Sequence, residues 1–253
     1  MAGSLGYLFT DNPPDVSYIA SQQWFWPAVI IGFLFVSLFQ VMAITAQRLG
    51  VSKVSIAVKM SVVLPVMAGV FFYHERLTIL GWMGVVLALL AVYFGTKKRY
   101  AIENNRQLSL LYFLPAILFF GNGSIDVMLK YAQHFWLRAN EMALFSGILF
   151  AFAFFWGILF ALHAIFVKSK LPAIRDLLWG LLLGVPNFGS IYFLLQALDK
   201  SNMASAAIYP INNVAIVGLS AVTGVILFKE QLSKLNLFGL FAAIIAILLI
   251  AYG

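Results

Sequence analysis

Two stretches of the chain, GVFFYHERLTILGWMG (69–84) and GVILFKEQLSKLNLFG (224–239), align without a gap at a separation of 155 residues. Glycine stands at both ends of each stretch, and a Glu-x-Leu step lies at the same place inside both. Apolar helices often match by chance, but glycines and a charged link at one spacing rarely do. We therefore interpret the two stretches as copies of one internal repeat.

The composition indicates that lipid is the solvent for most of the chain. Of the 253 residues, 63% are hydrophobic and only 10% are charged, with 24 Phe and a mean hydropathy of +0.97. Soluble domains carry about 25% charged residues, so a water-facing surface cannot be built here. The net charge of +7 fits basic loops at a membrane better than nucleic-acid binding. We expect the lipid bilayer as a partner, and no nucleic acid.

Eight segments are apolar enough for helices that cross a bilayer, which needs about 20 residues. Their lengths, and the lack of strict apolar/polar alternation, favour helices over barrel strands. The sequence divides into a first part over 1–98, a loop over 99–107 and a second part over 108–253. The segments are Trp26–Ala46, Val54–Tyr73, Leu80–Gly95, Leu108–Lys130, Met142–Val167, Leu177–Leu198, Ala204–Phe228 and Leu235–Tyr252.

The number of segments in each part predicts an inverted repeat. The second part holds five segments, and five is odd, so a matching five-helix unit enters the membrane from the opposite side. The first part holds only three. We therefore expect an all-α polytopic membrane protein with two inverted five-helix repeats, the first of them truncated. On this interpretation MAGSLGYLF (1–9) is the tail of a second helix.

The chain from about residue 26 to its end resembles EamA-type transporters of the drug/metabolite transporter superfamily. The most specific features are the helix links YHERLT (73–78) and FKEQLS (228–233), each followed by a glycine-containing helix. The resemblance implies ten helices in two inverted repeats and a central cavity lined from both halves. It also implies export or exchange of small metabolites.

Lys59 is the clearest polar candidate inside a predicted span. A charged residue at mid-helix costs about 2.5–3.5 kcal/mol on insertion scales, so it needs a reason. Lys59 either faces a cavity and holds an anionic group, or extends its ammonium to the headgroups. Asn212 and Asn213, in YPINNVA (209–215), place two amides in an apolar helix after Pro210. Asn213 lies 154 residues after Lys59, so the two hold near-equivalent repeat positions.

Further polar residues lie in two other segments. GNGSIDVMLK (121–130) contains Asn122 and Asp126, and Asp126 either pairs with Lys130 one turn on or binds a proton or a substrate amine. Asn187 follows Pro186 in a glycine-flanked segment, which predicts a kink with a polar wall. Glu75 and Glu230 are assigned to the helix links rather than to the site. The predicted substrate-binding residues are Lys59, Asn122, Asp126, Asn187, Asn212 and Asn213.

Enzyme chemistry finds little support in the sequence. The chain has no Cys, and its three His lack metal-protease spacing. No phosphate loop or dinucleotide fingerprint occurs, and we expect no cofactor. We predict an inner-membrane permease or exporter of small metabolites that works by alternating access. The alternative is a non-transporting truncated membrane protein, or an assembly partner that needs another chain to complete the helix bundle. A homodimer is one way to supply the missing helices.

Overall fold

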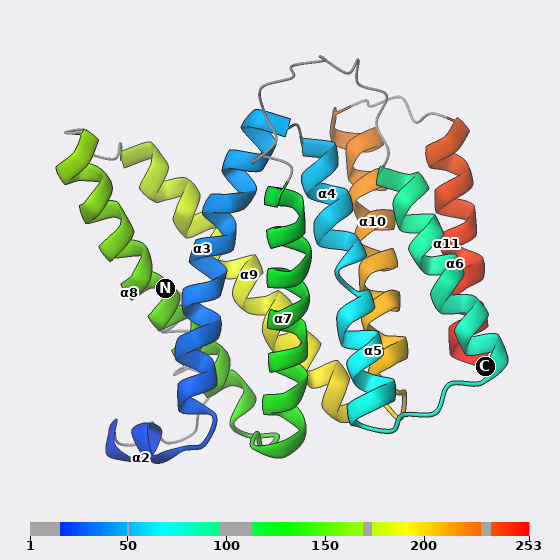
Figure 1. Cartoon of the computed structure of the whole chain (residues 1–253), viewed down its shortest axis with the longest axis horizontal. Helices are drawn as coiled ribbons and strands as arrows, with labels where there is room; N and C mark the ends of the chain where they lie inside the picture. The colour runs from blue at the N-terminus through cyan, green and yellow to red at the C-terminus, as the bar shows by residue number, and fades with distance from the viewer. Residues whose placement is uncertain (1–15, 50, 97–112, 169–173, 229–233, 253) are drawn as a thin grey trace. The chain divides into compact units, whose positions relative to one another are not determined.

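The computed structural model describes residues 16–49, 51–96, 113–168, 174–228 and 234–252, and every element in these ranges is a helix (Figure 1). The predicted helix tail at 1–9, the loop at 99–107 and Glu230 lie outside the described residues. The helices are α2 (Val16–Ser21), α3 (Phe25–Leu49), α4 (Val51–Met60), α5 (Val63–Phe72), α6 (Ile79–Thr96), α7 (Phe113–Phe135), α8 (Met142–Lys168), α9 (Ile174–Lys200), α10 (Ser205–Phe228) and α11 (Lys234–Tyr252).

Each of the eight predicted segments contains helix, with two differences. The segment Val54–Tyr73 is two helices, α4 and α5, and the short α2 was not predicted. By length and composition, four helical stretches of the described chain can each cross a bilayer. They are Phe25–Leu49, Val54–Phe72, Phe113–Phe135 and Met142–His163, and shorter apolar helices cover Ile79–Ala91, Ser205–Leu219 and Leu237–Ile250.

Proline marks the start of three helices. Pro27, Pro65 and Pro115 are each the third residue of their helix, in α3, α5 and α7 respectively. A proline has no backbone N–H to donate, and it is tolerated in the first turn because the N–H groups there have no partner in their own helix. Proline therefore lies in the first turn of all three helices.

Pro65 also explains why the second predicted span is interrupted. Its ring removes the hydrogen bond that the Ser61 carbonyl would accept in a continuous helix. The Ser61 carbonyl accepts instead from the Leu64 backbone N–H at 2.9 Å, one residue short of the α-helical partner. The Ser61 hydroxyl donates back to the Val58 carbonyl at 2.6 Å. The helix thus breaks at Ser61–Val62, two residues after Lys59.

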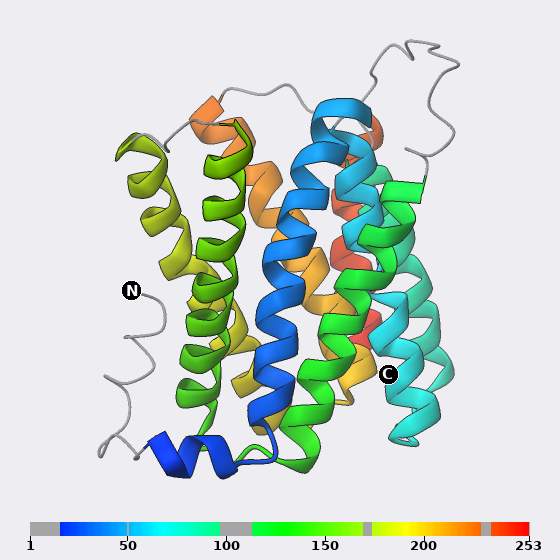
Figure 2. The same ribbon diagram turned by 60° about the vertical axis from the view of Figure 1, so that its left-hand side comes forward.

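The chain forms two compact units, and α3 and α7 each run from one into the other. The first unit combines 1–39 with 128–201. In it α3 packs on α8, where a Cβ on Gly32 would lie 2.8 Å from the Leu149 carbonyl oxygen. The rings of Phe33 and Trp156 meet edge to face in the same contact. The short α2 lies across the end of α3 (Figure 2).

The second unit combines 40–127 with 202–253, and its central feature is the pair α6–α11. The two helices lie side by side along their lengths (Figure 1). Gly84, near the start of α6, faces Ala246 and Ile250 near the end of α11, so the helices are antiparallel. Helix α10 packs against α5, α6 and α11.

Small buried residues line both helices of the pair at matching positions. Gly84, Ala88 and Ala91 are buried on α6. Gly239, Ala243 and Ala246, which are 155 residues later, are buried on α11. Small side chains let membrane helices approach closely, which increases van der Waals contact where lipid offers no hydrophobic gain.

Large apolar side chains cover the outer faces of both units. Phe154 on α8 is 71% exposed and Phe241 on α11 is 64% exposed, and many other Phe, Leu and Ile side chains are also exposed. Soluble monomers rarely expose apolar patches on this scale. These faces are the surfaces expected to contact lipid chains.

The α6–α11 contact predicts different effects of alanine at two glycines of α6. A Cβ at Gly84 would lie 2.6 Å from Ile250 Cγ1 and 3.0 Å from its backbone nitrogen, whereas a Cβ at Gly81 meets nothing closer than 3.5 Å. We expect Gly84→Ala to lower the free energy of unfolding by about 1–3 kcal/mol, because backbone atoms must move apart. Gly81→Ala, the control, should be neutral or stabilising. Unfolding in mixed micelles by SDS titration measures both, and equal values would contradict the close contact.

Candidate functional site

Three polar side chains lie along one face of α10, and each bonds to a different part of the second unit. Ser205, Tyr209 and Asn213 are spaced four residues apart, which places them on one side of a helix. Ser205 bonds to the link after α5, Tyr209 to α7 and Asn213 to α4. We call these three residues the polar face of α10.

Lys59 and Asn213 meet near the break between α4 and α5. The Lys59 Nζ donates to the Asn213 Oδ1 at 3.4 Å, and both residues are half-buried. Lys59 lies in the last turn of α4, where the free carbonyls of the helix end favour a positive charge. A lysine ammonium carries three donors, and this contact uses one of them.

Asp126 on α7 adds the opposite charge. The residue is half-buried, and its negative charge interacts with the positive charge of Lys59. Its backbone carbonyl accepts a hydrogen bond from the Tyr209 hydroxyl at 2.7 Å. Tyr209 is 2% exposed, so this bond lies inside the second unit. Within the described ranges, no side chain or backbone N–H donates to the Asp126 carboxylate.

Glu75 holds the start of α10. The Ser205 hydroxyl lies 2.7 and 2.8 Å from the two carboxylate oxygens of Glu75, and the Ala206 backbone N–H donates to one of them at 2.9 Å. The Glu75 backbone N–H in turn donates to the Gly69 carbonyl at 3.1 Å. The sequence assigned Glu75 to a helix link, and the structure makes it the cap of a helix that is 130 residues away.

The other predicted amides bond within their own helices or face outward. Asn122 donates to the Leu118 carbonyl at 2.9 Å, and Asn187 donates to the Leu183 carbonyl at 3.1 Å. Asn212 is exposed. Asn187 belongs to the first unit, whereas the remaining five predicted residues belong to the second. The structure therefore brings together Lys59, Asp126 and Asn213, and adds Tyr209.

The first unit holds its own polar contacts. The Lys130 Nζ donates to the Gln133 Oε1 at 3.3 Å, and the Gln133 amide donates to Asp199 at 3.5 Å. Tyr18 on α2 donates to the Glu141 carboxylate at 2.8 Å. This hydrogen bond, together with the negative charge of Glu141, raises the pKa of Tyr18 above its ordinary value of 10.0. The bond ties α2 to the beginning of α8.

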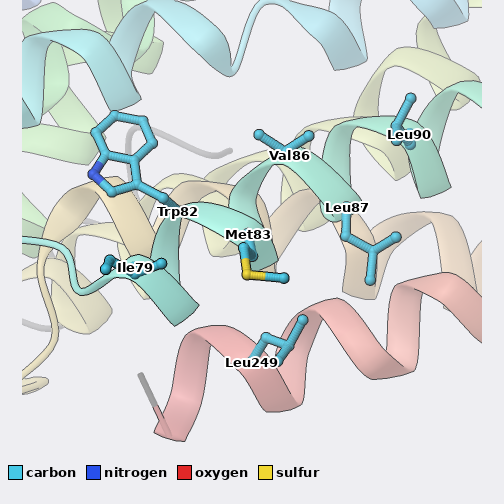
Figure 3. Close-up of a pocket in the computed structure, with 7 residues that line it drawn as sticks. All are labelled: Ile79, Trp82, Met83, Val86, Leu87, Leu90 and Leu249. Atoms are coloured by element: carbon cyan, nitrogen blue, oxygen red, sulfur yellow. The ribbon is translucent and has the colours of Figure 1, made fainter.

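An open groove of about 470 Å³ lies on the outer side of the α6–α11 pair (Figure 3). Met83 and Leu87 of α6 point toward α11, which contributes Leu249 (Figure 3). Its lining is apolar and aromatic: Ile79, Trp82, Met83, Val86, Leu87, Leu90 and Leu249. A site for a polar metabolite needs a few convergent polar groups, and this groove has none of the six predicted residues. The polar face of α10 is therefore the better candidate site.

Comparison with known proteins finds a matching family, a relative and a solved structure of similar fold. Residues 4–96 match the EamA-like transporter family. An uncharacterized protein of Haemophilus influenzae is 27% identical over 252 residues, which cover 98% of this chain and 80% of that protein. A solved crystal structure has a similar fold, with a TM-score of 0.73 and 14% identity over 98% of this chain and 82% of that one.

The Tyr209 contact predicts a measurable loss of stability when the hydroxyl is removed. Tyr209→Phe should lower the free energy of unfolding by about 1 kcal/mol, because the Asp126 carbonyl then loses a donor in an apolar setting. Tyr131→Phe is the matched control, since Tyr131 is 45% exposed and contacts its neighbours through its ring. SDS titration in mixed micelles compares the two, and an unchanged Tyr209→Phe would show that the bond carries no net stability.

Proposed function

We propose that the chain is an EamA-type member of the drug/metabolite transporter superfamily, and that it is an inner-membrane permease or exporter of small metabolites that works by alternating access; the match of residues 4–96 to the EamA-like transporter family supports this. The observation that carries the proposal is the contact between Lys59 and Asn213 beside Asp126. Charged residues inside membrane segments are expensive, and they commonly mark substrate or ion pathways. Neither the family match nor the relatives favour a non-transporting assembly partner.

We propose that the eight predicted segments all span the membrane, as parts of two inverted repeats. The antiparallel α6–α11 pair supports this arrangement, because the two helices are corresponding members of the two repeats. Buried small residues at the same 155-residue separation on both helices add support. A pseudo-two-fold axis in the membrane plane relates the halves of many secondary transporters.

The chemistry of the site suits a substrate with an anionic group. Lys59 has donors beyond the one that Asn213 accepts, so its ammonium can hold a carboxylate or a phosphate. The amide N–H₂ of Asn213 can donate to the same group. Asp126 then either accepts a proton during the cycle or binds a substrate amine, and both roles use its carboxylate.

Interrupted helices next to these side chains support movement at the site. The break at Ser61–Val62 follows Lys59, and Pro210 removes one backbone hydrogen bond of α10 three residues before Asn213. Discontinuous helices at the binding site are a common feature of transporters that alternate access. Asn122, which belongs to the same unit, would extend the polar wall of the proposed site with its side-chain oxygen.

The proposal predicts that Lys59→Leu and Asn213→Leu each abolish transport but leave expression and folding intact. Leucine fits an apolar span, whereas it removes the ammonium or the amide that holds the substrate. Uptake from a mixed pool of small organic acids and amino acids into proteoliposomes, read by mass spectrometry, measures the loss. Lys200→Leu is the control, because Lys200 is an exposed lysine at the end of α9. Full transport by the Lys59→Leu variant would remove Lys59 from the site.

A further inference from the structure

Helix α10 lacks one of its own backbone hydrogen bonds near its start. Pro210 cannot donate to the Ala206 carbonyl, which is its partner position in a regular helix. The Ala206 N–H lies in the first turn, where a helix offers no acceptor of its own. The N–H and the carbonyl of Ala206 therefore both lack the hydrogen-bond partner that a regular helix would provide. The first turn of α10 depends on contacts from outside the helix.

Glu75 supplies that outside contact. Its carboxylate accepts from the Ser205 hydroxyl and from the Ala206 N–H, at 2.7 to 2.9 Å. A negative charge at a helix N-terminus also complements the positive end of the helix dipole. A serine at a helix start commonly caps its own helix, but here its hydroxyl bonds to a glutamate from another part of the chain.

The space around this contact is filled. A Cβ on Gly69 would lie 2.5 Å from the Glu75 Oε2 and 3.1 Å from the Ser205 hydroxyl oxygen. Any side chain at Gly69 would therefore displace the carboxylate. The same glycine accepts the Glu75 backbone N–H, so α5 fixes both the backbone and the side chain of Glu75.

The residue that Glu75 holds shares a helix face with Asn213. Ser205 and Asn213 lie on one face of α10, about 12 Å apart along the helix axis. Holding the start of a helix at one rotation fixes which side chains face its neighbours two turns on. Tyr209, midway, is held by the Asp126 carbonyl on the same face.

We propose that Glu75 is a positioning residue for the Lys59–Asn213 pair: it holds the first turn of α10 at the rotation that presents Asn213 to Lys59. The proposal rests on the proposed function only where it describes that pair as a substrate site. The geometric part stands on the contacts of Glu75, Gly69 and Ser205 alone.

Thiol cross-linking tests the geometry without any substrate. The chain has no Cys, so Lys59→Cys and Asn213→Cys together create one defined pair. Because both side chains are replaced, the hydrogen bond between Lys59 and Asn213 cannot hold the two positions together. A short bifunctional thiol reagent then reports how often the two positions face each other. We expect Glu75→Ala and Gly69→Ala, each added to this pair, to slow cross-linking by about tenfold, the shift that the loss of one hydrogen bond to a charged group allows.

Two further variants make the result specific. Glu75→Gln keeps an acceptor for the Ala206 N–H and should recover most of the cross-linking rate. Glu141→Ala is the matched control, because Glu141 also precedes a helix and accepts from the Arg138 N–H and the Tyr18 hydroxyl in the first unit. Its rate should equal that of the parent pair. A parent-like rate in folded Glu75→Ala overturns the proposal. If Glu75→Ala does not fold, a parent-like rate in Gly69→Ala does the same.

Transport separates this proposal from the proposed function. With Lys59 and Asn213 restored, Glu75→Ala should raise the KM for the transported metabolite severalfold, and Glu75→Gln should return it toward the parent value. Slow cross-linking in a chain that transports nothing in the pool would support the positioning role and count against the transporter. Parent-like cross-linking in a chain that transports well would overturn the positioning role alone.

Discussion

The hydrogen bonds between the Glu75 carboxylate and the first turn of α10 are the contact on which the candidate site depends. Lipid cannot satisfy polar groups, so each one in a membrane helix must find a partner inside the protein. Pro210 leaves the start of α10 short of such partners. Glu75, the Asp126 carbonyl and Lys59 supply contacts at successive turns, and in doing so they fix the face that α10 turns toward α4 and α7.

The α6–α11 pair provides the rigid part of the same unit. Helices in lipid gain little hydrophobic free energy by pairing, so close backbone approach has to stabilise the contact. Glycine at 84 and alanine at 88 and 91 permit that approach, and corresponding residues on α11 do the same. Because one repeated pattern serves both sides of an antiparallel contact, a single ancestral helix surface would suffice to pack against its own copy.

Much of this arrangement could be predicted from residue patterns. Long apolar runs identify the helices, and the 154-residue separation of Lys59 and Asn213 predicts that they hold corresponding positions, which in the structure are in contact. The break after Lys59 was missed because the apolar run continues through it, although Pro65 was a signal that could have found it. The partners of Glu75 and Tyr209 could not be predicted, because contacts over 130 and 83 residues leave no local pattern. Asn122 and Asn187 look like Asn213 in sequence, but each bonds to a carbonyl one turn back, and local periodicity cannot distinguish these outcomes.

The positions of the two interruptions in helical hydrogen bonding suggest how such a site can move. The break at Ser61–Val62 and the missing bond at Pro210 lie within one turn of Lys59 and Asn213 respectively, so bending at either point changes the distance between the two side chains. The ends beyond the interruptions are held differently: Glu75 fixes α10 on its N-terminal side, and the α6–α11 pair forms a packed surface against which α10 lies. A transporter that works by alternating access, as proposed for this chain, needs flexible points beside the substrate and fixed points farther away. The described helices place one flexible point beside Lys59 and one beside Asn213, and they place the fixed points at the first turn of α10 and at the α6–α11 surface.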